Sequence, residues 1–229
     1  MKFDDMLNTI TLGDSYKLIK DIPDKSIDLV IIDPPYNFHC GTINKTGIFK
    51  NRECAPGKEI VNKKINNGYK LDILQDIVRV LKNINIFIWC NKEQIKDYLL
   101  FFEKCNTTFE ILTWHKTNPT PLTKNTFLPD TEYCLYFREK GKIFLNDGYD
   151  LKSKYYISQV NVEDKKKYDH PTIKPLEIIK KQILHTTQKE NIVLDCFSRK
   201  WNNMCCSKRI RQTIYRNRNR SRISQNKCR

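Results

Sequence analysis

Glycine is scarce in this sequence of 229 residues, with seven in all and none after Gly148. No apolar run approaches the roughly 20 residues of a membrane-spanning helix, and the first five residues lack the basic and then apolar order of a signal peptide. The nine cysteines include no CxxC pair, and none of the four histidines has zinc-ligand spacing. We therefore expect a soluble, cytoplasmic protein with free, mostly buried thiols and no metal site.

Acidic residues are missing from one part of the chain. The sequence has 41 Lys and Arg against 26 Asp and Glu, a formal net charge of +15, but residues 199–229 contribute 11 of the bases and no acid. Residues 1–198 keep 30 bases and 26 acids, a net charge of +4. A charge this small is weak support for nucleic-acid binding, so function has to be argued from local motifs.

Hydrophobic periodicity predicts alternating helices and strands. Residues 37–70 are polar and predict a long excursion outside the core, and residues 138–168 predict an irregular subdomain. Strands that alternate with helices predict a doubly wound, largely parallel α/β sheet with its ligand crevice beyond the carboxyl ends of the strands. The predicted helices lie at 15–22, 70–82, 93–104 and 175–185, and the predicted strands at 27–32, 84–89, 109–114, 132–137 and 191–195.

Chemistry is concentrated in the turn Asp33-Pro34-Pro35-Tyr36, which directly follows the most hydrophobic predicted strand. The prolines stiffen the backbone and remove two N–H groups, so the Asp33 carboxylate and a proline carbonyl offer two acceptors with no competing donor. Such a pair suits an exocyclic amino group, because it holds both N–H bonds and directs the nitrogen lone pair at an electrophile. Tyr36 supplies a flat face for a base that is flipped out of a duplex. The alternative is a plain Pro-Pro turn with an incidental acid.

Together with other segments, this turn resembles the amino-group DNA methyltransferases that use S-adenosylmethionine. The resemblance covers essentially 12–198, and its order of segments is that of the beta group of the family. It implies a Rossmann-like, doubly wound methyltransferase sheet in permuted order, incomplete at the carboxyl end. The segments that carry it are Gly13-Asp14 with Ile22 to Asn37, Trp114 to Pro119, Glu132 to Phe137, His170 to Glu177 (His-Pro-Thr-Ile-Lys-Pro-Leu-Glu), and Val193 to Ser198.

The resemblance also implies which residues form the catalytic part of the site. Asp33, Pro34, Pro35 and Tyr36 make the catalytic turn that holds the target base. His170 is expected to be structural, because methyl transfer to this amine needs no strong base before the new bond forms.

The cofactor side is implied in the same way. Asp195 opens the cofactor loop with Phe197 beside it, and Asp14 and Lys174 belong to segments that line the cofactor pocket. Simpler alternatives stay open for two of them: Asp14 as a helix N-cap and Lys174 as a solvated charge before Pro175.

The tail departs from the family pattern directly after Ser198. Relatives continue with a Gly-Ser-Gly-Thr-Thr turn that wraps the methionine part of the cofactor, whereas residues 199–204 read Arg-Lys-Trp-Asn-Asn-Met. Back-translated as AGG AAG TGG AAC AAC ATG and read without the first nucleotide, the same string encodes Gly-Ser-Gly-Thr-Thr. We interpret residues 199–229 as an out-of-frame, poorly ordered tail. The alternative is a genuine basic arm that binds nucleic acid.

The sequence thus predicts a DNA adenine-N6 methyltransferase whose catalytic domain is 1–198 and whose gene copy is impaired. Cytosine-N4 methylation stays open, since Asp at the first position of the turn only favours adenine, and so does an inactive DNA-binding remnant. Residues 38–68 and 138–168, with Lys63, Lys64, Lys152, Lys154, Tyr155 and Tyr156, are expected to contact DNA. Double-stranded DNA is the expected partner, and a cognate restriction endonuclease is a possible genetic partner.

Overall fold

A computed structural model describes residues 3–36, 69–119, 127–142, 148–160, 174–198 and 211–216. In chain order the elements are α1 (Phe3–Met6), β1 (Thr9–Leu12), α2 (Ser15–Leu18), η1 (Ile19–Asp21), β2 (Leu29–Ile32), α4 (Ile73–Val80), β3 (Asn85–Cys90), α5 (Ile95–Phe102), η2 (Glu103–Cys105), β4 (Thr107–Lys116), β5 (Thr131–Glu139), η3 (Tyr149–Leu151), β6 (Tyr155–Ser158), α7 (Leu176–Thr186), β7 (Ile192–Ser198) and β8 (Arg211–Arg216).

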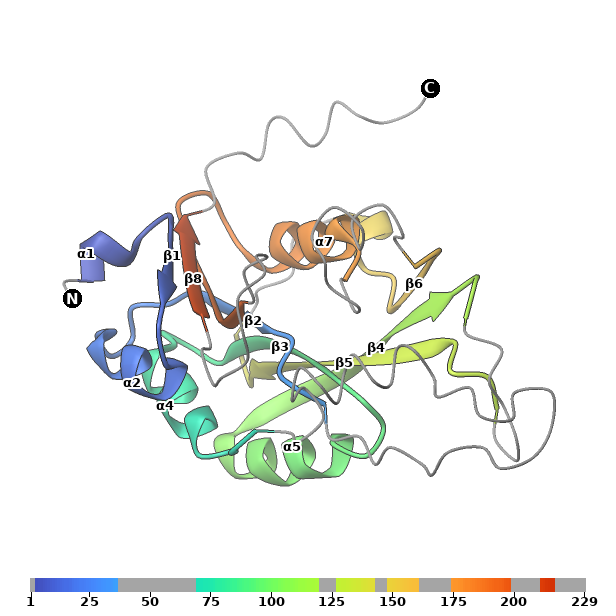
Figure 1. The fold of residues 1–229 in the computed structure, drawn as a ribbon, viewed down its shortest axis with the longest axis horizontal. Coiled ribbons are helices and arrows are strands. Elements are labelled where there is room, and N and C mark those ends of the chain that lie inside the picture. The colour runs from blue at the N-terminus through green and yellow to red at the C-terminus, as the bar shows by residue number, and fades with distance from the viewer. Residues whose placement is uncertain are drawn as a thin grey trace, which may run out of the picture.

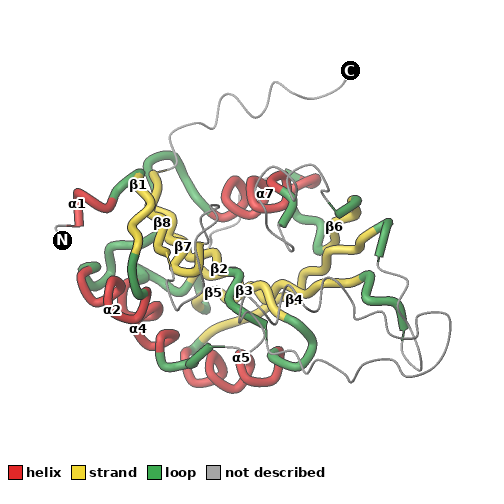
Figure 2. The backbone as a smooth tube through the Cα atoms, viewed as in Figure 1, coloured by secondary structure: helices red, strands yellow, loops and turns green. Residues whose placement is uncertain are grey.

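The strands form one mixed sheet in the order β1-β8-β7-β2-β3-β5-β4-β6 (Figure 2). Its centre is parallel, since β2 pairs in parallel with both β7 and β3. Outside this centre β5 runs antiparallel to β3 and β4, and β8 runs antiparallel to β7 and β1. β6 pairs in parallel with β4 at the edge. The doubly wound α/β prediction is confirmed, whereas the sheet is mixed, with parallel pairs at the centre and at the β6 edge.

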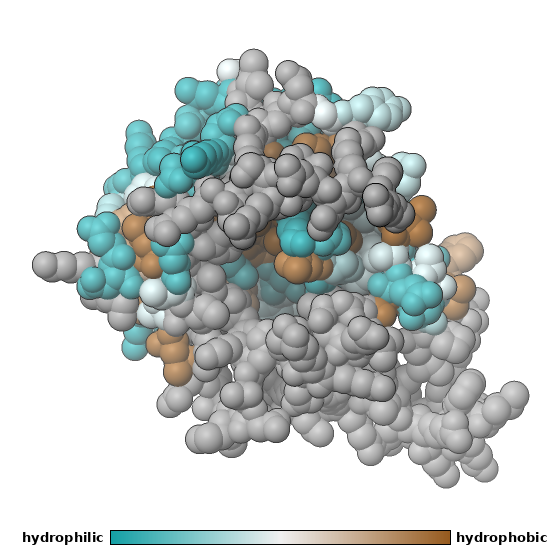
Figure 3. Space-filling model, turned by 90° about the horizontal axis from the view of Figure 1, so that it is seen from above, coloured by the Kyte–Doolittle hydropathy of each residue, from teal (hydrophilic) through white to brown (hydrophobic). Residues whose placement is uncertain are grey.

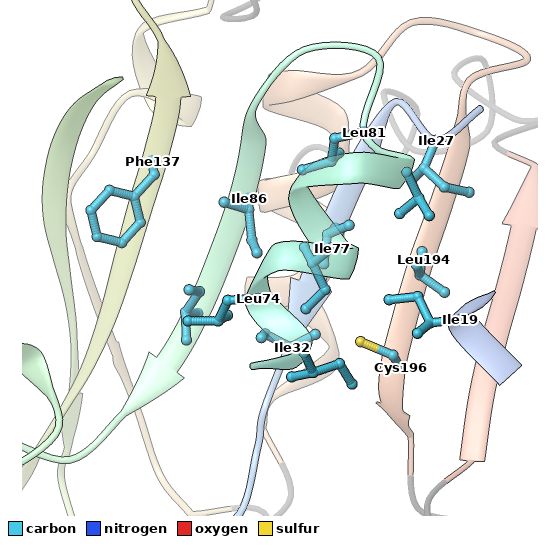
Figure 4. Packing of buried hydrophobic residues seen from close by; sticks show 14 of the residues in the cluster. Ile19, Ile27, Ile32, Leu74, Ile77, Leu81, Ile86, Phe137, Leu194 and Cys196 are labelled. Carbon is cyan, nitrogen blue, oxygen red and sulfur yellow. The ribbon is translucent and has the colours of Figure 1, made fainter. Parts of the chain in front are cut away.

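Helices cover both faces of the sheet. α7 lies on one face, and α2, α4 and α5 lie on the other (Figure 1). Figure 4 shows α4 packed over the central strands, with its Leu74 and Ile77 among residues of β2, β3 and β7. On the opposite face Ile178 of α7 belongs to a second cluster with Leu29, Phe87 and Trp89. Because both faces are covered, all residues of β2 and β3 are buried, which explains their unbroken apolar runs.

The helix α4 shows how local sequence sets an element. Asp72 precedes it, and the Asp72 carboxylate accepts a hydrogen bond from the Ile73 backbone N–H at 3.0 Å. Its buried residues, Ile73, Leu74, Ile77 and Val80, recur at helical spacing and face the sheet.

The predicted elements are all present, with changes at their margins. The helix expected at 15–22 is shorter, because α2 gives way to the 3-10 turn η1. The segment 138–168, expected to be irregular, contains the edge strand β6. Residues 211–216 pair with β1 and β7 as strand β8, so over these six residues the structure differs from the poorly ordered tail that was expected. The other residues of 199–229 lie outside the described residues.

The described surface is mixed in polarity (Figure 3), and the described cysteines are free thiols. Within the described ranges no helix is long and apolar enough to cross a membrane. On the face seen in Figure 3, the hydrophobic residues in view form small, separate groups among hydrophilic ones. Four of the described cysteines are free, and Cys90, Cys134 and Cys196 among them are buried, as the sequence predicted.

Candidate active site

The turn Asp33-Pro34-Pro35-Tyr36 leaves the sheet at the carboxyl end of β2. The register Ile32↔Ile88 places Asp33 level with Trp89 near the end of the neighbouring parallel strand β3. β4 runs in the same direction as β3, so it ends at this edge of the sheet. β5 runs in the opposite direction and starts there. Lys174, in the short segment before α7, also reaches this edge. The topology therefore gathers four other segments around the turn.

Lys174 makes the closest contact with the catalytic turn. Its ammonium nitrogen lies 2.8 Å from both carboxylate oxygens of Asp33. The Lys174 side chain is only 6% exposed, while that of Asp33 is 34% exposed. One lysine thus binds both oxygens of the acid from the protein side and leaves part of the carboxylate open to solvent.

Glu132, near the start of β5, is the second anion beside Lys174. Its Oε2 lies 3.1 Å from Lys174 Nζ, and its Oε1 lies 2.6 Å from the Nζ of Lys116 at the end of β4. Burial alone would raise the pKa of Glu132, but the two lysines outweigh it and lower that pKa to about 2. For Lys174, burial opposes the charge, and the carboxylates of Asp33 and Glu132 outweigh it, so its pKa is raised. Glu132 and Lys174 are therefore both charged at neutral pH.

Tyr36 stands beside this cluster and shares its charges. Its hydroxyl donates to Glu132 Oε2 at 3.3 Å, and the Lys174 ammonium lies 5.1 Å from the centre of its ring and 5.4 Å from that of Trp89. Burial, followed by the Asp33 and Glu132 carboxylates, raises the pKa of Tyr36 well above its ordinary value. The hydroxyl therefore stays protonated and acts as a donor.

The two proline carbonyls have different surroundings. The Pro35 carbonyl accepts a hydrogen bond from Gln94 Nε2 at 3.3 Å. Gln94 is buried and exchanges hydrogen bonds with Asn91, which fixes its side chain. Within the described part of the chain the Pro34 carbonyl accepts no hydrogen bond. Pro34 is therefore the proline whose carbonyl can serve beside Asp33 as the second acceptor.

A second group of predicted residues lies where β7 ends, next to β2. The Asp14 carboxylate accepts from the Tyr16 backbone N–H at 3.0 Å and caps α2, as its simpler alternative proposed. The next residue, Ser15, is buried and donates its hydroxyl to the Cys196 carbonyl. These contacts join the amino-terminal segment to the carboxyl end of β7.

Asp195 and Phe197 belong to this second group. Asp195 Oδ1 accepts from the Phe197 backbone N–H at 2.9 Å. Burial raises the pKa of Asp195 to about 7, the Phe197 N–H opposes the shift, and the Asp33 carboxylate adds to it. Phe197 is buried, and its ring packs edge to face against that of Tyr69, with 4.9 Å between the ring centres. The group thus combines a carboxylate whose negative charge has few stabilising contacts with an aromatic surface.

Residues 27–198 match the family model N6_N4_Mtase, described as DNA methylase. The chain belongs to this DNA methylase family. M2.LlaDCHI, a type II methyltransferase of Lactococcus lactis subsp. cremoris, is 28% identical over 203 residues, which are 81% of this chain and 74% of the relative.

Solved structures of DNA methyltransferases share the fold. The M1.HpyAVI–SAM complex superposes with a TM-score of 0.54 at 22% identity, covering 81% of this chain and 80% of that one. PvuII DNA methyltransferase, which is cytosine-N4-specific, gives 0.57 at 13% identity, covering 81% and 72%. With the family match, these likenesses confirm the predicted methyltransferase fold and the assignment of the chain to the amino-specific DNA methyltransferases.

Within the methylase, the structure brings the predicted site residues together in two neighbouring groups. Asp33, Pro34, Pro35 and Tyr36 form one turn, and Asp14, Asp195 and Phe197 gather at the end of β7. Lys174 binds Asp33 and is buried, so it is not the solvated charge of the simpler alternative. Its role beside the cofactor stays a prediction. His170 lies outside the described residues.

Sequence reasoning missed three residues of the methylase site. Glu132 and Lys116 are parts of segments that carried the resemblance, yet they were given no role, and Gln94 was not singled out. For Glu132 and Lys116 the available signal was position, since Glu132 opens a predicted strand and Lys116 follows one at the edge where the catalytic turn lies. Gln94 lies at the start of the helix predicted at 93–104.

Two residues expected to contact DNA are engaged within the methylase. Tyr156 is buried in the cluster beneath α7, so its ring is not presented to a base. Lys154 forms an ion pair with Glu110 at the surface. Tyr155 is 60% exposed and stays a candidate, and Lys63 and Lys64 lie outside the described residues.

Proposed function

We propose that this methylase transfers a methyl group from S-adenosylmethionine to N6 of an adenine flipped out of double-stranded DNA. The observation that carries the proposal is the turn itself: the Asp33 carboxylate, the Pro34 carbonyl and the Tyr36 ring lie together at the carboxyl edge of the central strands. This combination offers two acceptors for an exocyclic amino group and a stacking face for the ring of the flipped base.

The chain's own residues act by orientation. Asp33 and the Pro34 carbonyl accept the two N–H bonds of the amino group, which reduces delocalisation of the nitrogen lone pair into the ring. Tyr36 stacks on the base. The cofactor supplies the activated methyl group. The nitrogen forms the new N–C bond, the S–C bond breaks with its electrons staying on sulfur, and the nitrogen then loses a proton to Asp33 or water.

The second group of residues fits a cofactor that carries positive charge. Asp195 is a carboxylate whose pKa is raised to about 7 by burial, and in the described part of the chain its carboxylate accepts one hydrogen bond, from Phe197. A cationic ligand at this position would compensate the charge. Phe197 and Tyr69 provide an apolar wall beside it. We propose Asp195 and Phe197 as the residues that hold S-adenosylmethionine, with Asp14 fixing the adjoining α2.

Residues 199–229 affect how tightly this chain can bind its cofactor. We propose that residues 199–229 are out of frame, which removes the glycine turn from the cofactor site. An inactive DNA-binding remnant is the alternative for the chain as it stands. Titration calorimetry with S-adenosylmethionine compares the 229-residue chain with the frame-restored chain, obtained by deleting one nucleotide after the codon for Ser198. Weak binding by the first and tight binding by the second supports the frameshift, and equal micromolar binding contradicts it.

Adenine is favoured over cytosine by Asp33, since relatives that modify cytosine N4 more often carry Ser at this place. Cytosine N4 remains the alternative, and the fold is shared with a cytosine-N4-specific enzyme. We further propose that the protein acts in the cytoplasm, that residues 38–68 and 138–168 contact DNA, and that a restriction endonuclease of the same specificity accompanies it.

Sequencing of genomic DNA tests the substrate. Each gene, original and frame-restored, is expressed in a bacterial host that lacks DNA methylation, with an Asp33→Ala copy as control. N6-methyladenine at a fixed motif, absent with the Asp33→Ala copy, supports the proposal. Genomic DNA without any methylated base in all cultures contradicts it.

A further inference from the structure

Four charged side chains of the site form one continuous chain of ion pairs. Lys116 pairs with Glu132 at 2.6 Å, Glu132 with Lys174 at 3.1 Å, and Lys174 with both oxygens of Asp33 at 2.8 Å. Side-chain exposure is 6% at Lys174, 14% at Glu132 and 34% at Asp33. The two cations and two anions balance, and the most buried member, Lys174, connects Glu132 to Asp33, the most exposed one.

Glu132 also binds the aromatic member of the catalytic turn. The Tyr36 hydroxyl donates to Glu132 Oε2 at 3.3 Å, the same oxygen that faces Lys174. Glu132 therefore reaches both side chains that are proposed to hold the base, Tyr36 directly and Asp33 through one lysine.

The backbone of Glu132 is paired directly with β4, and with β3 through the next residue of β5. It lies opposite Trp114 in β4, and its neighbour Tyr133 lies opposite Cys90 in β3. The backbone of Glu132 belongs to a paired strand and so has a well-defined position, whereas Asp33 and Tyr36 lie in a turn. The geometry is that of a fixed residue that orients two less constrained ones.

We propose that Glu132 is a positioning residue for the target base, which orients Asp33 through Lys174 and Tyr36 through its hydroxyl. This inference rests on the proposed function. One ammonium on both oxygens fixes the plane of the Asp33 carboxylate, whose outer lone pairs remain for the amino group. The hydrogen bond to Tyr36 sets the tilt of the ring, so that acceptor and stacking face are aligned before the base arrives.

A purely structural role makes a different prediction. If Glu132 only neutralised Lys116 and Lys174, its loss would lower stability by leaving an unbalanced buried cation. A second change that removes one cation would then restore both stability and activity. The double variant Lys116→Met with Glu132→Gln has this restored balance but lacks the anchor for Asp33 and Tyr36.

The test measures the kinetics of tritium transfer from S-adenosylmethionine to unmethylated phage DNA, in the 229-residue chain and in the frame-restored chain. Variants are Glu132→Gln, the double variant, and Glu132→Asp as the conservative change. The matched control is Glu103→Gln, because Glu103 is exposed on η2, which precedes β4 at the end opposite the site. Thermal unfolding of each variant reports its fold.

We expect Glu132→Gln to lower kcat by about 10- to 100-fold, the effect of one lost charge-assisted hydrogen bond, and to change KM for the cofactor by less than about threefold. Glu132→Asp should recover part of kcat, the double variant should recover stability alone, and Glu103→Gln should match the parent. Normal kcat in a folded Glu132→Gln protein, or recovery of kcat by the double variant, overturns the inference. A parent without transfer in both forms overturns the proposed function, and the inference with it.

Discussion

Lys174 binds both carboxylate oxygens of Asp33 at 2.8 Å, although the two residues are 141 positions apart in the sequence. The contact joins the segment before α7 to the catalytic turn after β2. It also means that the acid of the turn is oriented by a side chain that is itself almost completely buried.

Replacement of Asp33 tests the acceptor. We expect Asp33→Ala to lower methyl transfer by at least about three orders of magnitude, because one preorganised acceptor is worth about 4 kcal/mol in the transition state. The fold should persist, since Asp33 lies in a turn and not in the core. Tritium transfer and circular dichroism measure the two effects. Asp4→Ala, an exposed acid on α1, is the control, and an Asp33→Ala protein with near-normal turnover would rule out the catalytic assignment.

Two substitutions of Tyr36 distinguish the stacking of its ring from the hydrogen bonding of its hydroxyl. Tyr36→Ala should weaken capture of the base by roughly 1–3 kcal/mol, the usual contribution of base stacking. Tyr36→Phe keeps the ring and loses the hydroxyl, which donates to Glu132 and also interacts with the Asp33 carboxylate, so its effect should be smaller, about 1 kcal/mol. Fluorescence of 2-aminopurine at the target position measures flipping. Equal flipping by the parent and by Tyr36→Ala would show that the ring does not stack on the base.

Replacement of Asn85, which lies away from the site, should lower the stability of the fold. Asn85 is buried, donates to the Asp28 and Thr186 carbonyls at 3.0 and 3.1 Å, and accepts from the Tyr136 hydroxyl at 3.1 Å. Asn85→Leu leaves these groups unpaired and should lower the free energy of unfolding by about 2–4 kcal/mol.

The matched change in this network is Tyr136→Phe, which removes only the donor to Asn85 and should cost about 1 kcal/mol. Tyr149→Phe is the control, because Tyr149 is 95% exposed. Urea unfolding measures all three variants. Unchanged stability in Asn85→Leu would mean that this network does not hold β3 to α7.

Asp195 predicts a pH dependence of stability. Its pKa in the folded state, about 7, lies above the usual value of about 3.9, so the folded protein binds this proton more tightly than the unfolded chain. The contribution of Asp195 to stability should therefore fall as pH rises from about 4 to 7 and stay constant above. Since the side chain is half-buried by its exposed area, we expect a loss of about 2 kcal/mol.

Asp195→Asn isolates this effect, because the amide oxygen can still accept from the Phe197 N–H. The difference in unfolding free energy between the variant and the parent should grow in favour of the variant between pH 5 and pH 8. The lowered pKa of Glu132 acts below about pH 4.5, outside this window. A difference independent of pH would show that Asp195 is ionised throughout the range.

Much of this architecture could be predicted because burial on two faces leaves a plain signal. The runs in β2 and β3 are apolar without alternation, and α4 carries apolar residues at helical spacing. Strand direction leaves no such pattern in the sequence. The apolar residues around Leu135 would be buried in the same way whether β5 lay parallel or antiparallel to β3. The prediction of a largely parallel sheet was therefore wrong on the β5 side, where strands run antiparallel.

The site was predictable where its members are contiguous. Asp33 to Tyr36 form one motif after one strand, whereas the pairing of Lys174 with Asp33 depends on how the chain returns before α7. Glu132 is one of 26 acidic residues, and only the fold reveals that it lies between two lysines.

The most direct test of the account is the identity of the methylated nucleoside. Unmethylated duplex DNA is incubated with S-adenosylmethionine and the frame-restored chain, digested, and analysed by mass spectrometry. The account predicts N6-methyldeoxyadenosine that disappears with Asp33→Ala. N4-methyldeoxycytidine alone, or N6-methyldeoxyadenosine that persists in the Asp33→Ala protein, would contradict it.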